Sequence, residues 1–82
     1  MCRKKLELDD QQKAKAVLQK LQDVYAHEEL DLLDGVKILR ERSWVQVRAS
    51  NTEPILRVMS EAPTAEVAEQ LCIELIKAVQ AR

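Results

Sequence analysis

Two stretches of the chain carry apolar side chains at spacings of three and four residues, the pattern of a helix with one buried face. The first predicted helix spans residues 10–26, with these apolar positions: Ala14, Val17, Leu18, Leu21, Val24 and Tyr25. The second spans residues 64–81, with these: Val67, Ala68, Leu71, Cys72, Leu75, Ile76 and Val79. An amphipathic helix can also bind a partner, but stripes this narrow favour packing on the chain's own sheet.

The predicted helix starts carry residue types that cap a helix. Asp9 and Asp10 predict the start of the first helix, and Asp9, with Gln12 three positions further on, resembles a capping box. Thr64, which follows Pro63, is the predicted N-cap of the last helix. Glu66 then lies in the first turn, where a negative charge favours the helix dipole.

Shorter stretches alternate apolar and polar residues and predict four β-strands, at residues 3–8, 36–39, 44–48 and 55–59. Residues 27–35 predict a connector. Residues 40–43 lack the Gly or Asn that a two-residue hairpin turn prefers, so we expect a longer loop there. The order strand, helix, three strands, helix predicts one α+β domain over residues 1–82. It is a two-layer domain, with a four-stranded, mainly antiparallel sheet and two helices packed on one face.

Alternation in the last two predicted strands assigns their side chains to opposite faces of the sheet. The set that faces the helices is Val45, Val47, Leu56 and Val58. The opposite set is Trp44, Gln46, Arg48, Ile55, Arg57 and Met59. Three members of the second set are large and apolar, so one hypothesis is that this face packs partly on a neighbouring domain. The alternative is scattered exposed apolar residues, which are common.

Composition and charge narrow the classes of function. The net charge is −1, and Trp44 and Tyr25 are the only aromatic residues, which disfavours a nucleic-acid partner. No apolar run has the length of a membrane span, so we expect no membrane partner. Cys2 and Cys72 have no metal-ligand spacing, which predicts free thiols and a cytoplasmic location.

The predicted connector holds the remaining candidates for chemistry. His27 is the only histidine, and its place just past a predicted helix favours a surface or helix-dipole role over catalysis. Asp31 and Asp34 could suggest a metal. No third acidic residue is spaced to join them, which favours a solvated loop and no metal site.

One polar loop differs from the others because an arginine flanks it on each side. The sequence from Arg48 to Arg57 reads RASNTEPILR. A guanidinium group can bind two phosphate oxygens at once, and unpaired N–H groups in a bent loop form an anion-binding concavity. The residues therefore indicate a phosphate-binding loop at one end of a hairpin. The alternative, an ordinary polar turn with arginines in solvent, stays open at this point.

Two residues of this loop are assigned structural roles. Pro54 opens the last predicted strand, where its missing N–H disturbs the sheet least. The carboxylate of Glu53 would repel a phosphate, so we expect it to hold an arginine or the loop backbone.

Residues 48–57 resemble the phosphate-binding loop in the fourth, C-terminal domain of the α-D-phosphohexomutases, the phosphomannomutase/phosphoglucomutase enzymes and their relatives. The likeness continues at residues 34–38, 43–48 and 61–62. It implies a TATA-binding-protein-like fold and these phosphate contacts: Arg48, Ser50, Asn51, Thr52 and Arg57. Ala49 replaces a Pro of many relatives, which would leave the empty loop less rigid. Asn51 in place of Gly is more similar to phosphomannomutase/phosphoglucomutase than to phosphoglucosamine mutase.

The resemblance also implies an activity for a longer parent enzyme. Such enzymes are isomerases that interconvert a hexose 1-phosphate and a hexose 6-phosphate, of mannose or glucose, by intramolecular phosphotransfer. They use a phosphoserine, Mg²⁺ and a hexose 1,6-bisphosphate activator. The phosphoserine and metal loops of the family are not in this sequence. We therefore expect residues 1–82 to be a fragment without cofactors or catalytic residues of its own.

Two functions follow as alternatives. In the first, the fragment clamps the non-transferred phosphate of a hexose phosphate, with other domains of the parent chain as its partners. In the second, it is a stand-alone module that binds an anion or a phosphorylated ligand without catalysis.

Overall fold

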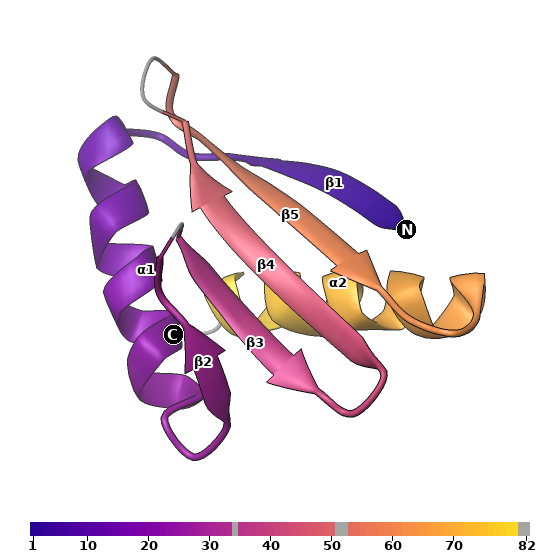
Figure 1. The fold of residues 1–82 in the computed structure, drawn as a ribbon. Coiled ribbons are helices and arrows are strands. Elements are labelled where there is room, and N and C mark those ends of the chain that lie inside the picture. The colour runs from indigo at the N-terminus through magenta and orange to yellow at the C-terminus, as the bar shows by residue number, and fades with distance from the viewer. Residues whose placement is uncertain (34, 51–52, 81–82) are drawn as a thin grey trace.

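The computed structural model describes residues 1–33, 35–50 and 53–80, and over them one sheet is covered by two helices (Figure 1). The elements in chain order are β1 (Cys2–Glu7), α1 (Gln11–Val24), β2 (Glu29–Asp31), β3 (Val36–Arg40), β4 (Ser43–Ala49), β5 (Ile55–Glu61) and α2 (Ala65–Gln80). All neighbouring strands are antiparallel, in the order β1-β5-β4-β3-β2. Figure 1 looks onto the open face of the sheet, with α2 crossing behind it. The predicted two-layer α+β class is confirmed, with five strands in place of four.

The strand that the sequence did not predict is β2, within the expected connector. Leu30 of β2 pairs with Ile38 of β3 and points to the core, while Glu29 and Asp31 on either side are exposed. Three residues are too short for alternation to be distinguished from a polar loop. Leu32 and Leu33, both exposed, extend the apolar run beyond the strand and blur the pattern further.

The turn between β3 and β4 also differs from the prediction. Arg40 pairs with Ser43, so only Glu41 and Arg42 lie between the strands. Arg42 has φ 61°, the left-handed backbone that Gly or Asn usually supplies. The expected longer loop is therefore wrong, because an arginine adopts the conformation that a tight turn requires.

Both helices begin with a side-chain cap. Asp10, not Asp9, caps α1: its backbone is extended, and its Oδ1 accepts a hydrogen bond of 2.9 Å from the N–H of Gln12. Asp9 lies outside the helix and forms an ion pair of 3.1 Å with Lys13. Thr64 caps α2 as predicted, since its Oγ1 accepts a 3.2 Å bond from the N–H of Val67.

The core lies between the sheet and the helices. Its buried apolar members are Ala14, Leu21, Tyr25, Val36, Ile38, Val45, Val47, Leu56, Val58, Leu71, Cys72 and Leu75. They include every residue of β4 and β5 that alternation assigned to the helix side. Ser60 of β5 is also buried. Its hydroxyl donates to the Ala68 carbonyl of α2 and lies 3.2 Å from the Cys72 sulfur. Burial raises the pKa of the Cys72 thiol, so this cysteine is a neutral core residue as predicted.

Gly35 fixes the approach of β3 to β4. Its φ is 74°, and a Cβ there would lie 2.1 Å from the carbonyl oxygen of Val47. The backbone of Arg48 lies next to the same point, at 3.2 Å. Only glycine allows the start of β3 to lie this close to β4, because any side chain would collide with backbone that cannot move aside.

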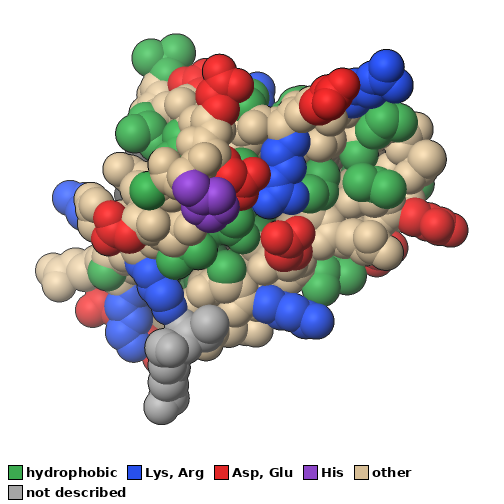
Figure 2. Space-filling model, turned by 90° about the horizontal axis from the view of Figure 1, so that it is seen from below, with side chains coloured by type: hydrophobic (Ala, Val, Ile, Leu, Met, Phe, Trp, Pro, Cys, Tyr) green, Lys and Arg blue, Asp and Glu red, His purple; other side chains and the backbone are tan. Residues whose placement is uncertain are grey.

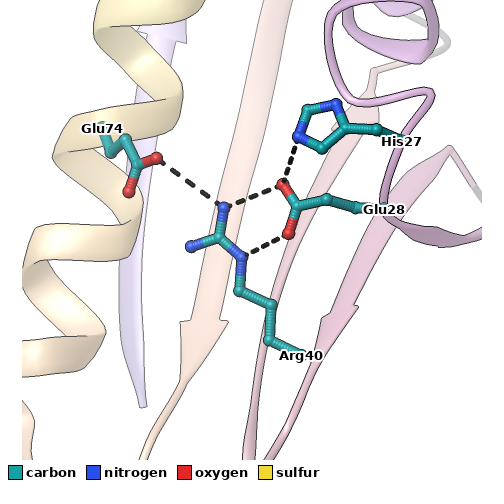
Figure 3. Close-up of polar contacts among 4 residues, drawn as sticks. All are labelled: His27, Glu28, Arg40 and Glu74. Atoms are coloured by element: carbon teal, nitrogen blue, oxygen red, sulfur yellow. Dashed lines mark hydrogen bonds and ion pairs between the residues drawn. The ribbon is translucent and has the colours of Figure 1, made fainter.

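The other end of the sheet is held by an ion-pair cluster (Figure 3). Arg40, the last residue of β3, donates to both carboxylate oxygens of Glu28, at 2.8 and 3.0 Å. Its second partner is Glu74 of α2, at 3.7 Å. The hydrogen bond from Arg40 lowers the pKa of Glu28, and the same bond raises the pKa of Arg40. One guanidinium thus joins β3, the segment before β2, and α2.

Charges of both signs alternate at this lower end of the molecule. Figure 2 views it from below and shows acidic, basic and hydrophobic side chains interspersed, without a large patch of any one kind. His27, exposed, lies 4.0 Å from Glu28 at the edge of the cluster. This agrees with the predicted surface role of the histidine.

Candidate functional site

Arg48 and Arg57 are direct cross-strand partners on β4 and β5. Their sequence neighbours Val47, Leu56 and Val58 are buried on the helix side, so both arginines project from the open face and are exposed. Side chains directly opposite on an antiparallel pair have Cβ atoms roughly 5 Å apart. The sheet therefore places the two arginine side chains next to each other on the open face, as the face pattern predicted. Phosphate binding by them stays a prediction.

The loop beyond the arginines continues the hairpin by one more bonded pair. The N–H of Ser50 donates to the Ile55 carbonyl at 3.1 Å, which places Ser50 on the same face as Arg48. The hydroxyl oxygen of Ser50 accepts a 3.3 Å bond from the N–H of Glu53. Ser50 thus shapes the turn next to the arginines. Asn51 and Thr52, the other two predicted phosphate contacts, lie outside the described residues.

Glu53 and Pro54 hold the end of the loop through their backbone. The Glu53 carbonyl accepts a 2.8 Å bond from the N–H of Ile55, and the Pro54 carbonyl accepts a 2.7 Å bond from the N–H of Leu8. The second bond ties the loop to the segment that leaves β1. Within the described ranges, the loop is anchored to the first strand as well as to its own hairpin.

The sequence did not indicate that β1 contributes to this surface. β1 pairs with β5, and the register sets Lys5 opposite Arg57 and Arg3 opposite Met59. Lys5 and Arg3 are exposed and share the open face with the two arginines. In β1, exposed Arg3 and Lys5 alternate with half-buried Lys4 and Leu6. This alternation could have indicated that Arg3 and Lys5 share one face of the strand. The order of strands in the sheet, which brings β1 beside β5, cannot be read from local spacing.

A hollow of about 580 Å³ occupies this part of the open face. Its walls are Arg3, Lys4, Lys5, Arg48, Arg57 and Met59. The volume lies within the ~300–1,000 Å³ range of small-molecule pockets. Every charged side chain in its walls is cationic, although the whole chain has a net charge of −1. The hollow suits a small anion.

The carboxylates nearby belong to a different surface. Glu7 and Glu53 line a second, smaller hollow of about 260 Å³ at the loop end of β1, together with Leu8, Pro54 and Ile55. Neither carboxylate contributes to the walls of the basic hollow. Cationic and acidic side chains therefore occupy separate depressions.

The open face is less apolar than its sequence suggested. The ring of Trp44 is covered by the ammonium group of Lys37, 4.5 Å from the ring centroid, and its Nε1 donates to Glu61 at 3.2 Å. Ile55 is only 6% exposed. Met59, half-buried, lies in the basic hollow. Of these three residues, only Met59 lines the basic hollow. Packing of this face on a neighbouring domain stays a prediction.

A metal ion, a membrane or a disulfide would each require its own arrangement of the residues that the structure describes. No group of three or more His, Cys, Asp or Glu side chains there is arranged to hold a metal ion. None of the described helices is long and apolar enough to cross a membrane. Cys2 and Cys72 are both free thiols.

Comparison with known families gives a match over most of the chain. Residues 4–78 match the family described as phosphoglucomutase/phosphomannomutase, C-terminal domain. This range includes all seven residues assigned to the loop and its flanking arginines.

Individual relatives agree with the family match. A phosphoglucosamine/phosphogalactosamine mutase of Sulfurisphaera tokodaii is 40% identical over 68 residues, which are 80% of this chain and 15% of the relative. A phosphoglucomutase/phosphomannomutase of Thermococcus kodakarensis is 51% identical over 41 residues, 50% of this chain and 9% of the relative. A probable phosphoglucosamine mutase of Pyrococcus horikoshii is 37% identical over 73 residues, 84% of this chain and 16% of the relative. The chain thus spans a small part of each relative.

Proposed function

Because the chain belongs to the family of phosphoglucomutase/phosphomannomutase C-terminal domains, we propose that it binds the phosphate of a hexose phosphate on its open face. The observation that carries this proposal is the direct pairing of Arg48 with Arg57 beside the Ser50 loop. Two adjacent guanidinium forks offer a phosphate dianion several charge-assisted hydrogen bonds in a fixed geometry. Ser50, Asn51 and Thr52 complete the proposed contacts from the loop.

The proposed role is to position a substrate, as one domain of a larger phosphohexomutase. Holding the phosphate that is not transferred would fix the sugar relative to the reacting groups and neutralise its charge. The names of the relatives cover glucosamine, galactosamine, glucose and mannose phosphates, so a hexose phosphate is their common ligand class. The small share of each relative that the chain spans supports a domain role over a free-standing phosphate-binding module.

The family resemblance implies Mg²⁺ and a hexose 1,6-bisphosphate activator for the parent enzyme. The described residues offer no cluster that could hold a metal. On the resemblance, we assign Mg²⁺ to other domains of a parent enzyme and give this domain contacts to the sugar phosphate alone. The free thiols agree with the reducing cytoplasm that we propose as its location.

The direct test is a titration of the isotopically labelled chain with inorganic phosphate and with mannose 1-phosphate, followed through backbone amide shifts. We expect the largest shifts at residues 48–57. Arg57→Ala should weaken binding of both ligands. Arg42→Asn is the matched control, because it removes an arginine from the far end of β4 at a left-handed position that Asn adopts easily. Shifts spread evenly over the surface would contradict the proposal.

A further inference from the structure

The two arginines belong to a longer row of cations. Lys5, Arg57 and Arg48 are directly opposite one another on three neighbouring strands, β1, β5 and β4. All three are exposed on the open face, and adjacent strands lie about 4.8 Å apart. Arg3 lies two residues from Lys5 on the same face, at the next position of the hollow.

Repulsion between neighbouring cations in this row destabilises the folded sheet unless a negative charge offsets it. Like charges directly opposite in a sheet destabilise the pair, and the adjacent strands of this row are closer together than the ~8 Å screening length of physiological salt. Among the described residues, Lys5 and Arg57 form no ion pair, in contrast to Lys4, whose ammonium group lies 3.8 Å from Glu69 of α2. Glu7, on the same face of β1, forms an ion pair with neither of them. The sheet brings these cations together without a carboxylate for Lys5 or Arg57.

We propose that Lys5 of β1 is a further ligand of the phosphate held by Arg48 and Arg57, with Arg3 as an outer contact. The inference rests on the proposed function and deepens it. The ligand class is a phosphate monoester dianion, which has three terminal oxygens. The two guanidinium forks approach from β4 and β5, while the compact ammonium of Lys5 approaches from β1, on the side of Arg57 away from Arg48. The site is then built from strands that lie far apart in the sequence.

Its dependence on β1 distinguishes this site from a phosphate loop that acts alone. The backbone bond from Leu8 to the Pro54 carbonyl fixes the end of β1 against the loop. Lys5 is therefore held at a defined distance from Arg57 by strand pairing on one side and by the loop on the other. A phosphate bound to the loop alone would leave Lys5 without effect on affinity.

The test compares Lys5→Met with Lys15→Met in the whole 82-residue chain. Both substitutions remove one lysine charge and keep the unbranched stem. Lys15 is exposed on α1, on the other layer of the molecule. Binding of inorganic phosphate and of mannose 1-phosphate is measured by calorimetry and by amide shifts at low ionic strength. We expect Lys5→Met to weaken both ligands about tenfold, the scale of one hydrogen bond to a charged group. Lys15→Met should leave both unchanged.

The outcomes separate the two proposals. Loss of binding in Arg57→Ala with wild-type binding in Lys5→Met would overturn the inference and keep the proposed function. Wild-type binding in both variants, or no binding by the wild-type chain, would overturn both. Equal losses in Lys5→Met and Lys15→Met would show a general charge effect and would also overturn the inference. Lys5→Arg keeps the charge and should therefore retain most of the wild-type affinity that Lys5→Met loses.

Discussion

The two ends of the sheet use arginine in opposite ways. At the lower end, Arg40 is half-buried and shared between Glu28 and Glu74, so its charge is neutralised within the fold. At the loop end, Arg57 is exposed, stands between Lys5 and Arg48, and has no carboxylate partner in the described part of the chain. Arg40 joins elements of the fold. Arg57 is held in place by strand pairing, with its guanidinium directed at solvent. The contrast indicates which arginine serves stability and which is available to a ligand.

Arg40→Ala should produce the largest effect of these variants, and this effect should be a loss of stability alone. It leaves the Glu28 carboxylate partly buried without its partner and releases α2 from β3. We expect a loss of about 2–3 kcal/mol in the free energy of unfolding, measured by urea denaturation. Phosphate affinity should stay at the wild-type value. A variant that kept its stability would show that the cluster is an incidental surface contact.

Arg57→Ala should produce the converse result. We expect phosphate binding to weaken by about 1–3 kcal/mol, the range for hydrogen bonds to charged groups. The free energy of unfolding should not fall, because this side chain has no ion-pair partner among the described residues. Calorimetric titration and urea denaturation of the same preparation measure both quantities. A large loss of stability would place Arg57 in the same class as Arg40.

The lower end should also respond to acid. The pKa of Glu28 is below its ordinary value of 4.5, mainly because of the bond from Arg40. A carboxylate with a depressed folded pKa stabilises the protein above its unfolded pKa and loses this contribution as pH falls through the folded value. The free energy of unfolding of the wild type should therefore exceed that of Glu28→Gln by about 1–2 kcal/mol at pH 7. The difference should shrink below about pH 4.5, as urea denaturation at several pH values would measure.

The smallest expected effect is a gain in stability when one cation is removed at the loop end of the sheet. Lys5→Met should raise the stability of the chain without phosphate by about 0.2–1 kcal/mol, because it removes one of three facing cations. High salt should abolish the gain, since it screens the same repulsion in the wild type. Thermal unfolding at low and high salt provides the measurement. A gain that is independent of salt would come from the apolar methionine instead.

The fold could be predicted as far as its long, regular patterns extend. Both helices and the strands β3, β4 and β5 carry enough alternating or periodic residues to be recognised, and the faces of Arg48 and Arg57 follow from the same alternation. β2 could not be recognised because only Leu30 points inward. The tight turn could not, because Arg42 occupies a backbone conformation that is rare for arginine.

The site was predictable as a loop but not as a surface. The motif identifies residues 48–57, whereas the participation of Lys5 and Arg3 depends on β1 lying next to β5. That neighbour relation is set by packing of the whole chain, since β1 could equally extend the other edge of the sheet as far as local spacing shows. Distant pairing is the information that motif and periodicity do not contain.

The pairing of β1 with β5 also sets an order of events during synthesis. Within this domain β1 is synthesised before α1, β2, β3 and β4, and its partner β5 follows only after them, so the edge of β1 stays unpaired while that intervening segment is made. Exposed strand edges invite association between nascent chains, and charged side chains, lysine above all, oppose it. Arg3, Lys4 and Lys5 place three successive cations on that edge. The side chains that we propose to face a phosphate in the finished fold would thus also keep neighbouring nascent chains apart, an effect that aggregation of chains truncated before β5 would measure.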